Sequence, residues 1–127
     1  MEDLLVFDKL KIESHKGEYL VNFSLNCFED LSSKRIVDGL YIIDKNISNL
    51  YRKELRHILE KERYLIIEAN ESNKSLDKFE GYIDSLMHLG IRRKQQLVAI
   101  GGGIIQDITC FLASTVMRGL PWIFIPT

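Results

Sequence analysis

Three consecutive glycines, Gly101, Gly102 and Gly103, stand between an apolar run and a stretch with helical periodicity. Successive glycines let a diphosphate approach the backbone closely, because no Cβ atoms stand in the way. The free N–H groups and the positive end of the following helix then favour the anion. The alternative is a tight strand-to-helix turn that binds nothing. The spacing is not the usual GxGxxG fingerprint, but the strand–glycine–helix order favours phosphate binding over that alternative.

Polar side chains that follow two other apolar runs are further candidates. Asp44 and Asn46 follow one run, and Glu71 and Lys74 follow the next. An acidic residue at the tip of a buried strand suits ribose hydroxyls, but Asp and Asn also favour turns and helix caps, which this segment alone indicates more strongly. Glu71 and Lys74 taken singly form an ordinary surface pair. Polar groups from three strand ends at one edge make a stronger case for a site together.

Two charged residues mark the ends of the helix that follows the glycines. Asp107 lies four residues beyond Gly103, where it either favours the helix N-terminus electrostatically or points back to hydrogen-bond a ligand. The spacing leaves both roles open. Arg118 precedes Gly119 at the other end, where an arginine is favourable without any function. Its guanidinium also suits a phosphate or carboxylate clamp, although the pattern favours the electrostatic role.

The elements that must position these residues alternate between strand and helix. Continuous apolar runs predict buried parallel strands at 40–43, 64–67, 97–100 and 122–125. Periodicity and capping residues predict helices from Ser48 or Asn49 to about 61, from Ser75 to Gly90, and from 104 to 117. The predicted apolar faces of the first two helices are Leu50, Tyr51, Leu55, Ile58 and Leu59, and Leu76, Phe79, Ile83, Leu86 and Met87.

This alternation predicts an α/β fold, with a Rossmann-like parallel sheet and flanking helices. Ahead of it, the runs 10–13 and 19–23 around a glycine-containing connection predict an N-terminal β-hairpin. In open parallel sheets, ligands bind outside the carboxyl ends of the strands. The candidate residues that follow the strands are therefore expected at one edge.

Composition excludes several classes of protein. The 127 residues fit one domain, and 46% hydrophobic with 28% charged residues is the balance of a soluble globular protein. Seventeen basic residues against eighteen acidic ones indicate neither a nucleic-acid partner nor a membrane surface. Residues 1–5 lack the features of a signal peptide, and Cys27 and Cys110 are too few for a disulfide framework. We therefore expect a cytoplasmic protein with reduced thiols.

Two other groups of residues have mainly ordinary explanations. Arg92-Arg93-Lys94 is predicted to be a solvated turn between a helix and a strand. The histidines His15, His57 and His88 fall on different elements with no metal-ligand spacing. The sequence therefore predicts no metal site in this chain.

The stretch 97–127, LVAIGGGIIQDITCFLASTVMRGLPWIFIPT, closely resembles the central signature of the 3-dehydroquinate synthase family. Several separated elements of that signature keep their order and spacing. They are the glycine triplet, Asp107, the Phe-x-Ala of residues 111–113, Arg118-Gly119 and Pro126-Thr127. The upstream segments Asp44-Lys45-Asn46 and 71–74 agree more loosely.

The resemblance implies an N-terminal NAD-binding domain. It puts one set of residues on NAD-contacting positions: Asp44, Asn46, Glu71, Lys74, Gly101, Gly102, Gly103, Ile104, Asp107 and Thr127. It puts Arg118 on a substrate-binding position, where a fixed fork suits an anion. The implied reaction belongs to the shikimate pathway of aromatic amino acid biosynthesis. It is the metal-dependent cyclisation of 3-deoxy-D-arabino-heptulosonate 7-phosphate to 3-dehydroquinate, a lyase reaction in which phosphate leaves and NAD is recycled.

The resemblance also implies a second domain. In the family, the Pro-Thr segment continues into a helical domain that donates one Glu and two His to a divalent metal, zinc or cobalt. This chain ends at Thr127. We therefore expect residues 1–127 to be the NAD-binding domain alone, without catalytic or metal-binding residues and inactive by itself. The full-length protein is expected to be a homodimer that acts on a small sugar phosphate.

Departures from the family pattern leave alternatives. Gln106 and Cys110 replace common glycines, and Ala69-Asn70 replaces an Asp/Pro-Gly pair, as in a divergent relative such as another sugar-phosphate cyclase. Iron-containing alcohol and glycerol dehydrogenases share the glycine triplet and aspartate, but they usually continue with Ala-Lys, whereas this helix ends in Arg118-Gly119. That difference favours the synthase. The non-enzyme alternative is a nucleotide-binding or oligomerisation module.

Overall fold

A computed structural model describes residues 9–24, 27–28 and 39–127 of the chain. The chain divides into two compact units, residues 1–34 and residues 35–127. The N-terminal residues 1–5, expected to carry no signal peptide, lie outside the described residues. Among the residues that are described, no helix has both the length and the apolar character needed to cross a bilayer.

The first unit contains the predicted hairpin. Strands β1 (Lys9–Ser14) and β2 (Gly17–Asn22) pair antiparallel across their whole length. Residues 15–16 form the turn, and Gly17 begins β2 with a φ of 131°, a conformation that favours glycine. The predicted hairpin is therefore confirmed.

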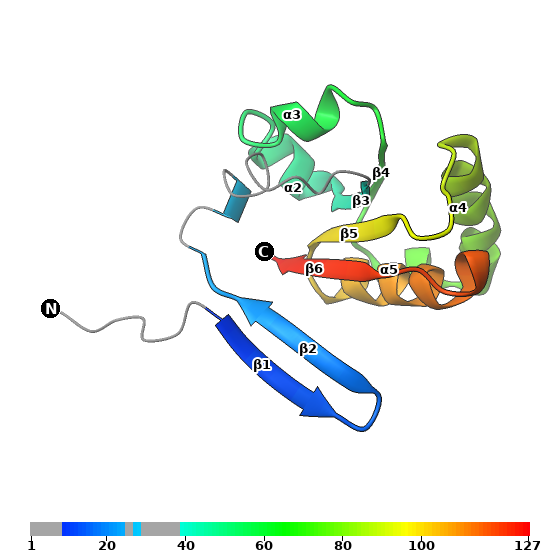
Figure 1. Cartoon of the computed structure of the whole chain (residues 1–127). Helices are drawn as coiled ribbons and strands as arrows, with labels where there is room; N and C mark the ends of the chain where they lie inside the picture. Colours follow the sequence, from blue (N-terminus) through cyan, green and yellow to red (C-terminus); the bar gives the residue numbers. More distant parts are fainter. Residues whose placement is uncertain (1–8, 25–26, 29–38) are drawn as a thin grey trace, which may run out of the picture. The chain divides into compact units, whose positions relative to one another are not determined.

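The second unit contains a four-stranded parallel sheet. Its strands are β3 (Gly39–Asp44), β4 (Tyr64–Ile67), β5 (Gln96–Gly101) and β6 (Trp122–Pro126). They lie in the order β4-β3-β5-β6, and each neighbouring pair is parallel. All four predicted strands are confirmed (Figure 1), and the central strands β3 and β5 have the most deeply buried residues. This arrangement confirms the predicted α/β class.

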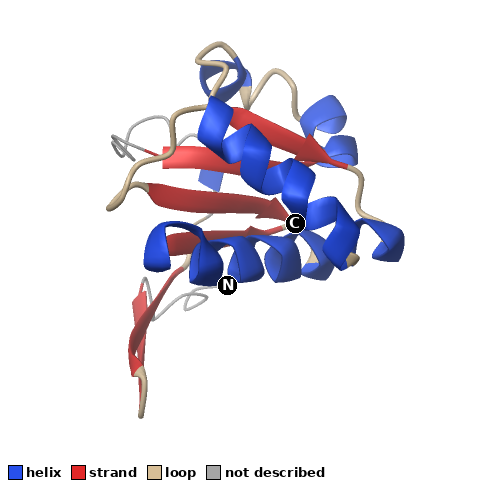
Figure 2. Cartoon of the chain, turned by 90° about the vertical axis from the view of Figure 1, so that its right-hand side faces the viewer, coloured by secondary structure: helices blue, strands red, loops and turns tan. Residues whose placement is uncertain are grey.

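Helical segments connect the strands on both faces of the sheet (Figure 2). Helices α2 (Lys45–Leu50) and α3 (Arg56–Leu59) connect β3 to β4. The turn η1 (Glu71–Lys74) and helix α4 (Leu76–His88) lead to β5, and α5 (Gly103–Thr115) with η2 (Val116–Arg118) leads to β6. Right-handed crossovers put α2 and α3 on one face and α4 and α5 on the other, because the chain moves in opposite directions along the sheet.

The core on the α5 face is formed by alternate residues of the central strands. Leu40 and Ile42 of β3 and Leu97 of β5 pack with Ile105 and Ile108 of α5, and all five are fully buried. The intervening strand residues point to the opposite face, because side chains alternate along a strand. Both faces of β3 and β5 are therefore covered, as their continuous apolar runs predict.

The prediction of one helix from Ser48 or Asn49 to residue 61 was wrong. Asp44 caps the segment instead, so α2 begins immediately after β3, and the chain turns between α2 and α3. Leu50 is 75% exposed, and Tyr51 is also exposed, whereas Leu55 is fully buried. Leu55 at the N-cap of α3 and Ile58 within it therefore supply the buried apolar side chains, whereas Leu50 at the end of α2 stays exposed.

Helix α4 lies within its predicted limits, but its buried face is narrower than expected. Phe79 and Leu86 are buried, whereas Leu76 and Met87 at the two ends are exposed. The ring of Phe79 lies 4.5 Å from the ring of Phe111 on α5, measured between centroids. Helix α4 contacts edge strand β4, and through Phe79 it contacts α5, so it buries only a narrow stripe.

We expect Gly101→Ala to destabilise the fold by about 1–3 kcal/mol, the usual cost of overpacking a close-packed contact. A Cβ atom at Gly101 would lie 2.9 Å from Ile105 Cβ and 3.2 Å from Asp44 Cβ. Urea denaturation measures the change in the free energy of unfolding. The matched control is Gly81→Ala on α4, where an added Cβ meets nothing within 4 Å. That exchange should stabilise the helix by about 0.5–1 kcal/mol, and equal effects at the two sites would contradict this packing.

Candidate functional site

The carboxyl ends of β3 and β5 form the point at which the chain reverses its direction along the sheet. From β3 the chain continues to β4 on one side, and from β5 it continues to β6 on the other. The connections leaving these strands therefore diverge, and open α/β sheets bind ligands at such a switch point. Asp44 ends β3 and Gly101 ends β5 at this point.

The three glycines have two different roles. Gly101 is buried, and its missing Cβ allows Ile105 and Asp44 to pack against the backbone, so an internal contact requires it. None of the three has a positive φ, so the close contact at Gly101 is the one feature here that fits the alternative of a tight strand-to-helix turn. Cβ atoms added at Gly102 or Gly103 would meet nothing within 4 Å. The absence of side chains there leaves open space above the turn.

Helix α5 begins at this open turn without a side-chain cap. Gly102 is the N-cap residue, and among the described residues no side-chain cap hydrogen bond reaches the start of the helix. The N-cap residues of α3 and α4 likewise make no side-chain cap bond, whereas Asp44 caps α2 and Asn70 caps η1. The first N–H groups of a helix have no partners within the helix and carry the positive end of its dipole. The start of α5 therefore presents donors and partial positive charge beside open space.

An ion-paired group of three residues lies at the same edge. Lys74 Nζ lies 2.8 Å from Asp107 Oδ2 on α5 and 3.4 Å from Glu71 Oε2 on η1. The hydrogen bond to Asp107 is the main cause that raises the pKa of Lys74. Asp107 is thus held by Lys74, a role that helical spacing alone did not suggest. No local spacing signals this pair, because its members are 33 positions apart and follow different strands.

Asp44 and Asn46 stand at the beginning of α2. The Asn46 N–H donates to Asp44 Oδ1 at 2.8 Å, so the capping role weighed for Asp44 is confirmed. Asn46 itself is exposed. The cap fixes the Asp44 carboxylate beside Gly101, at the tip of β3. A role toward ribose hydroxyls stays a prediction.

Two further candidates complete this edge. The N–H of Thr127 donates to the carbonyl of Gly101 at 3.0 Å, which fixes the residue after β6 beside the end of β5. Ile104 is half-buried in the first turn of α5, and Thr127 is exposed. Together with the residues above, the structure brings all ten predicted cofactor-contacting positions to the carboxyl side of the sheet.

Arg118 does not join this group. Helix α5 runs from the carboxyl side back to the amino side, and its 13 residues span about 20 Å at 1.5 Å per residue. Arg118 follows in η2, is exposed and has a left-handed φ of 64°. It therefore stands near the beginning of β6, and its predicted role in substrate binding remains a prediction.

The described residues do not offer a metal site. They contain no group of three or more His, Cys, Asp and Glu residues arranged to hold an ion. His15, His57 and His88 lie on separate elements, and Nδ1 of His88 lies 2.8 Å from the carbonyl oxygen of Asp84 in its own helix.

The family described as "3-dehydroquinate synthase N-terminal" matches residues 64–127, half of the chain. Among full-length relatives, the 3-dehydroquinate synthase of Thermoanaerobacter pseudethanolicus is 30% identical over 133 aligned positions. That alignment covers 94% of this chain and 36% of the relative, so the chain spans about a third of the relative's length.

Two solved structures have similar folds. A 2-deoxy-scyllo-inosose synthase, complexed with carbaglucose-6-phosphate, NAD+ and Co2+, matches with a TM-score of 0.76 at 20% identity, over 94% of this chain and 35% of that protein. A 2-epi-5-epi-valiolone synthase from Streptomyces hygroscopicus subsp. jinggangensis, with NAD+ and Zn2+ bound, matches with a TM-score of 0.64 at 25% identity, over 78% of this chain and 29% of that protein. The first likeness, at 20% identity, concerns the fold alone.

We expect Asp107→Asn to lower the pKa of Lys74, since the hydrogen bond to Asp107 is the largest cause that raises it. Glu71→Gln should lower it less, because the bond to Glu71 is a smaller cause. Titration of the Lys74 side chain by NMR measures both. A raised lysine pKa stabilises the fold below the ordinary value of 10.5, and this contribution disappears as pH rises through the folded value. The effect of Asp107→Asn on stability should therefore shrink in alkali, and an unchanged Lys74 pKa would contradict the pairing.

Proposed function

Because this chain belongs to the 3-dehydroquinate synthase family, we propose that residues 1–127 are the NAD-binding N-terminal domain of a 3-dehydroquinate synthase-like enzyme. The observation that carries the proposal is the uncapped start of α5 beside open space at Gly102 and Gly103. This start lies next to Asp44, where the strand connections diverge. An anionic group flanked by ribose hydroxyls is the ligand that such an edge suits.

The chemistry of each residue suits it to a different part of the cofactor. The N–H groups at the start of α5, including that of Ile104, would bind the diphosphate, which the positive helix end favours. The Asp44 carboxylate would accept hydrogen bonds from ribose hydroxyls, as strand-tip acids do in related sheets. The cap with Asn46 holds that carboxylate in position, so little ordering is needed on binding.

The remaining polar residues of this edge would contact the rest of the cofactor. Lys74 supplies a cation that Asp107 and Glu71 already position, and Thr127 supplies a hydroxyl beside the end of β5. Two carboxylates around one lysine leave this group with net negative charge, so the diphosphate belongs at the helix start and not at the lysine. These assignments would put the diphosphate at the glycines and the less charged parts of NAD toward η1.

For the whole enzyme we propose the cyclisation of 3-deoxy-D-arabino-heptulosonate 7-phosphate to 3-dehydroquinate with loss of phosphate. NAD, when bound, supplies reversible hydride acceptance from a substrate hydroxyl. The contribution of this chain is to bind and orient that cofactor. Arg118 remains the proposed contact for an anionic substrate group. Because it stands about 20 Å from the glycine turn, it would not bind the cofactor diphosphate in the same chain.

We also propose that residues 1–127 alone bind the cofactor without completing the reaction. The chain spans about a third of the synthase relatives that it matches. Zn2+ or Co2+ accompanies NAD+ in the two similar cyclase structures. A divalent metal held by a further domain, in a homodimeric cytoplasmic enzyme, is the arrangement that we propose for the full-length protein.

Another sugar-phosphate cyclase is the second candidate function. Two such enzymes share the fold of this chain. Gln106 and Cys110 also differ from the glycines common in 3-dehydroquinate synthases, and both lie on α5. The curated relatives at about 30% identity are 3-dehydroquinate synthases, which favours the first candidate.

We expect Gly102→Val and Asp44→Asn each to weaken NAD binding without unfolding the chain. A Cβ added at Gly102 would meet nothing within 4 Å, so the methyl groups of valine would enter the open space. Asparagine keeps the α2 cap but loses the charge, and a hydrogen bond to a charged group is worth about 1.5–3 kcal/mol, or roughly tenfold to a hundredfold in affinity. Isothermal titration with NAD measures both. Gly81→Ala is the control, and unchanged affinity in both test variants would count against this site.

We expect the 127-residue chain to release no phosphate from 3-deoxy-D-arabino-heptulosonate 7-phosphate in the presence of NAD and zinc. The described residues hold no metal-binding group of three, so the metal-dependent part of the reaction lacks its ligands here. A phosphate-release assay, with a full-length 3-dehydroquinate synthase as the positive control, measures this. Turnover by the chain alone would refute the proposal that residues 1–127 bind the cofactor without completing the reaction, even if NAD binds as expected.

A further inference from the structure

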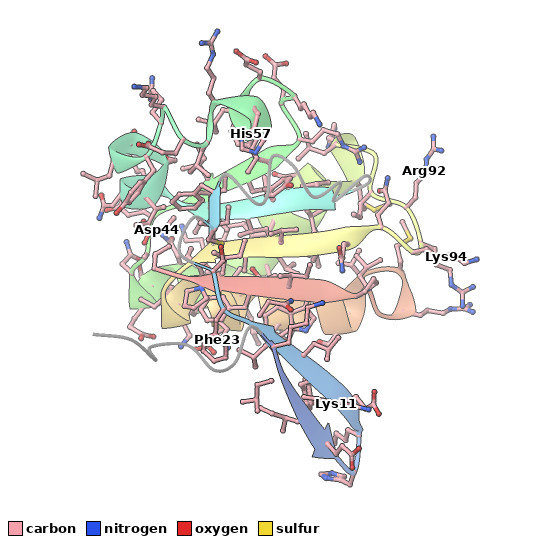
Figure 3. All side chains as sticks on the ribbon, turned by 60° about the vertical axis from the view of Figure 1, so that its left-hand side comes forward. Lys11, Phe23, Asp44, His57, Arg92 and Lys94 are labelled. Carbon is pink, nitrogen blue, oxygen red and sulfur yellow. The ribbon has the colours of Figure 1, made fainter. Side chains whose placement is uncertain are left out.

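A basic hollow lies at the amino side of the sheet, away from the glycine turn. It has a volume of about 520 Å³ and is lined by Arg63, Leu89, Gly90, Arg92, Arg93, Lys94 and Gln95. Figure 3 shows Arg92 and Lys94 at the opposite end of the strands from Asp44. We propose that this basic hollow is a second anion site, for a compact small molecule that carries several phosphate or carboxylate charges.

The charge of the basic hollow comes from two separate parts of the chain. Arg63 directly precedes β4, and Arg92, Arg93 and Lys94 precede β5. Four of the seven lining residues are cationic, and no lining residue is acidic. Within the described residues, no ion pair involves Arg92, Arg93 or Lys94. The like charges of Arg92, Arg93 and Lys94 on adjacent residues repel one another, so a polyvalent anion would stabilise the arrangement.

Gln95 links Arg63 to the turn at residues 92–94. It is 8% exposed, and its Oε1 accepts the Arg92 N–H at 2.7 Å and a hydrogen bond from Arg63 Nη2 at 3.4 Å. One buried amide oxygen thus ties the turn before β5 to the guanidinium before β4. Guanidinium groups bind carboxylates and phosphates through two parallel hydrogen bonds, so this tie positions donors for such a ligand.

The backbone of the basic hollow is also strained. Lys94 has a φ of 77°, a left-handed conformation that non-glycine residues rarely adopt. Glu62, beside the hollow, has a φ of 53°. A left-handed lysine costs stability that glycine at the same position would not, and such strain tends to persist where the side chain has a function. The cost at Lys94 therefore supports a use for its ammonium group.

Two simpler explanations do not account for the whole arrangement. Cations near the end of α4 compensate the negative end of that helix, but this does not require Arg63 from another element. A solvated turn explains the exposure of residues 92–94, but not the buried Gln95 that ties Arg63 to it. The lining contains no aromatic side chain on which a base would stack. A compact oxyanion therefore suits the basic hollow better than a nucleic acid.

The test is an NMR titration of the 127-residue chain with pyrophosphate and with citrate at 0.15 M salt, following backbone amides. We expect saturable shifts at residues 92–95 with at least one of the two. Binding of pyrophosphate alone would indicate a ligand with phosphate groups, and binding of citrate alone a ligand with carboxylates. Because each backbone amide gives its own signal, pyrophosphate that binds at residues 102–105 is measured separately. The proposed cofactor site and the basic hollow are therefore tested independently. Shifts that do not saturate at 92–95, or saturation only with a polyglutamate peptide, would overturn the proposal.

Charge-matched variants separate the basic hollow from diffuse attraction. R92A/R93A should weaken binding at residues 92–95 by about tenfold or more, the loss expected for charged hydrogen bonds. R52A/K53A removes the same charge from exposed positions outside the hollow and should leave affinity within about twofold. All four side chains are exposed, so both variants should fold. Equal weakening by the two variants would contradict a built site.

Lys94→Gly gives a second readout with opposite signs. It should raise the thermal midpoint, because glycine relieves the left-handed strain, while it weakens anion binding at residues 92–95. Glu62→Gly relieves comparable strain beside the basic hollow without removing a cation, so it should raise the midpoint and retain binding. If Lys94→Gly left the anion affinity unchanged, Lys94 would not belong to the site, and the function inferred from its strained backbone would be wrong.

Discussion

The contact between Gly101, Asp44 and Ile105 determines the geometry of the carboxyl side of the sheet. Because Gly101 has no Cβ, the first turn of α5 packs directly against the ends of β5 and β3. That contact puts the uncapped helix start beside the acid that caps α2. A side chain at Gly101 would push the helix away from the strand ends. The relation between the helix dipole and the Asp44 carboxylate, on which the proposed cofactor site depends, would then be lost.

Much of this arrangement was predictable from local patterns. The four apolar runs located the strands within two residues, because buried parallel strands need continuous apolar sequence. Their parallel pairing then brought the candidate residues to one edge by topology alone. The segment between β3 and β4 was predicted wrongly, since its periodicity fitted one helix and the Asp44 cap and the turn after Leu50 depend on packing. The pairing of Lys74 with Asp107 could not be predicted from the sequence either, because it joins elements that meet only in the folded chain.

The two ends of the sheet carry different chemistry. At the carboxyl side lie the backbone N–H donors of α5, the Asp44 carboxylate that caps α2, and Lys74 between two acidic side chains. This set of groups suits a dinucleotide with an anionic centre and neutral flanks. At the amino side, the basic hollow gathers cations around Gln95 and suits a smaller, more highly charged anion. About 20 Å of helix α5 separates the two sides. The same parallel sheet therefore supports two electrostatically distinct surfaces.

The most direct test of the central claim is to map NAD onto the isotopically labelled 127-residue chain by the shifts of its backbone amides. Our account predicts that the largest saturable shifts fall at residues 102–105, with further shifts at Asp44, Asn46 and Thr127. Shifts concentrated at residues 92–95, or spread without saturation, would contradict a cofactor site built on the start of α5.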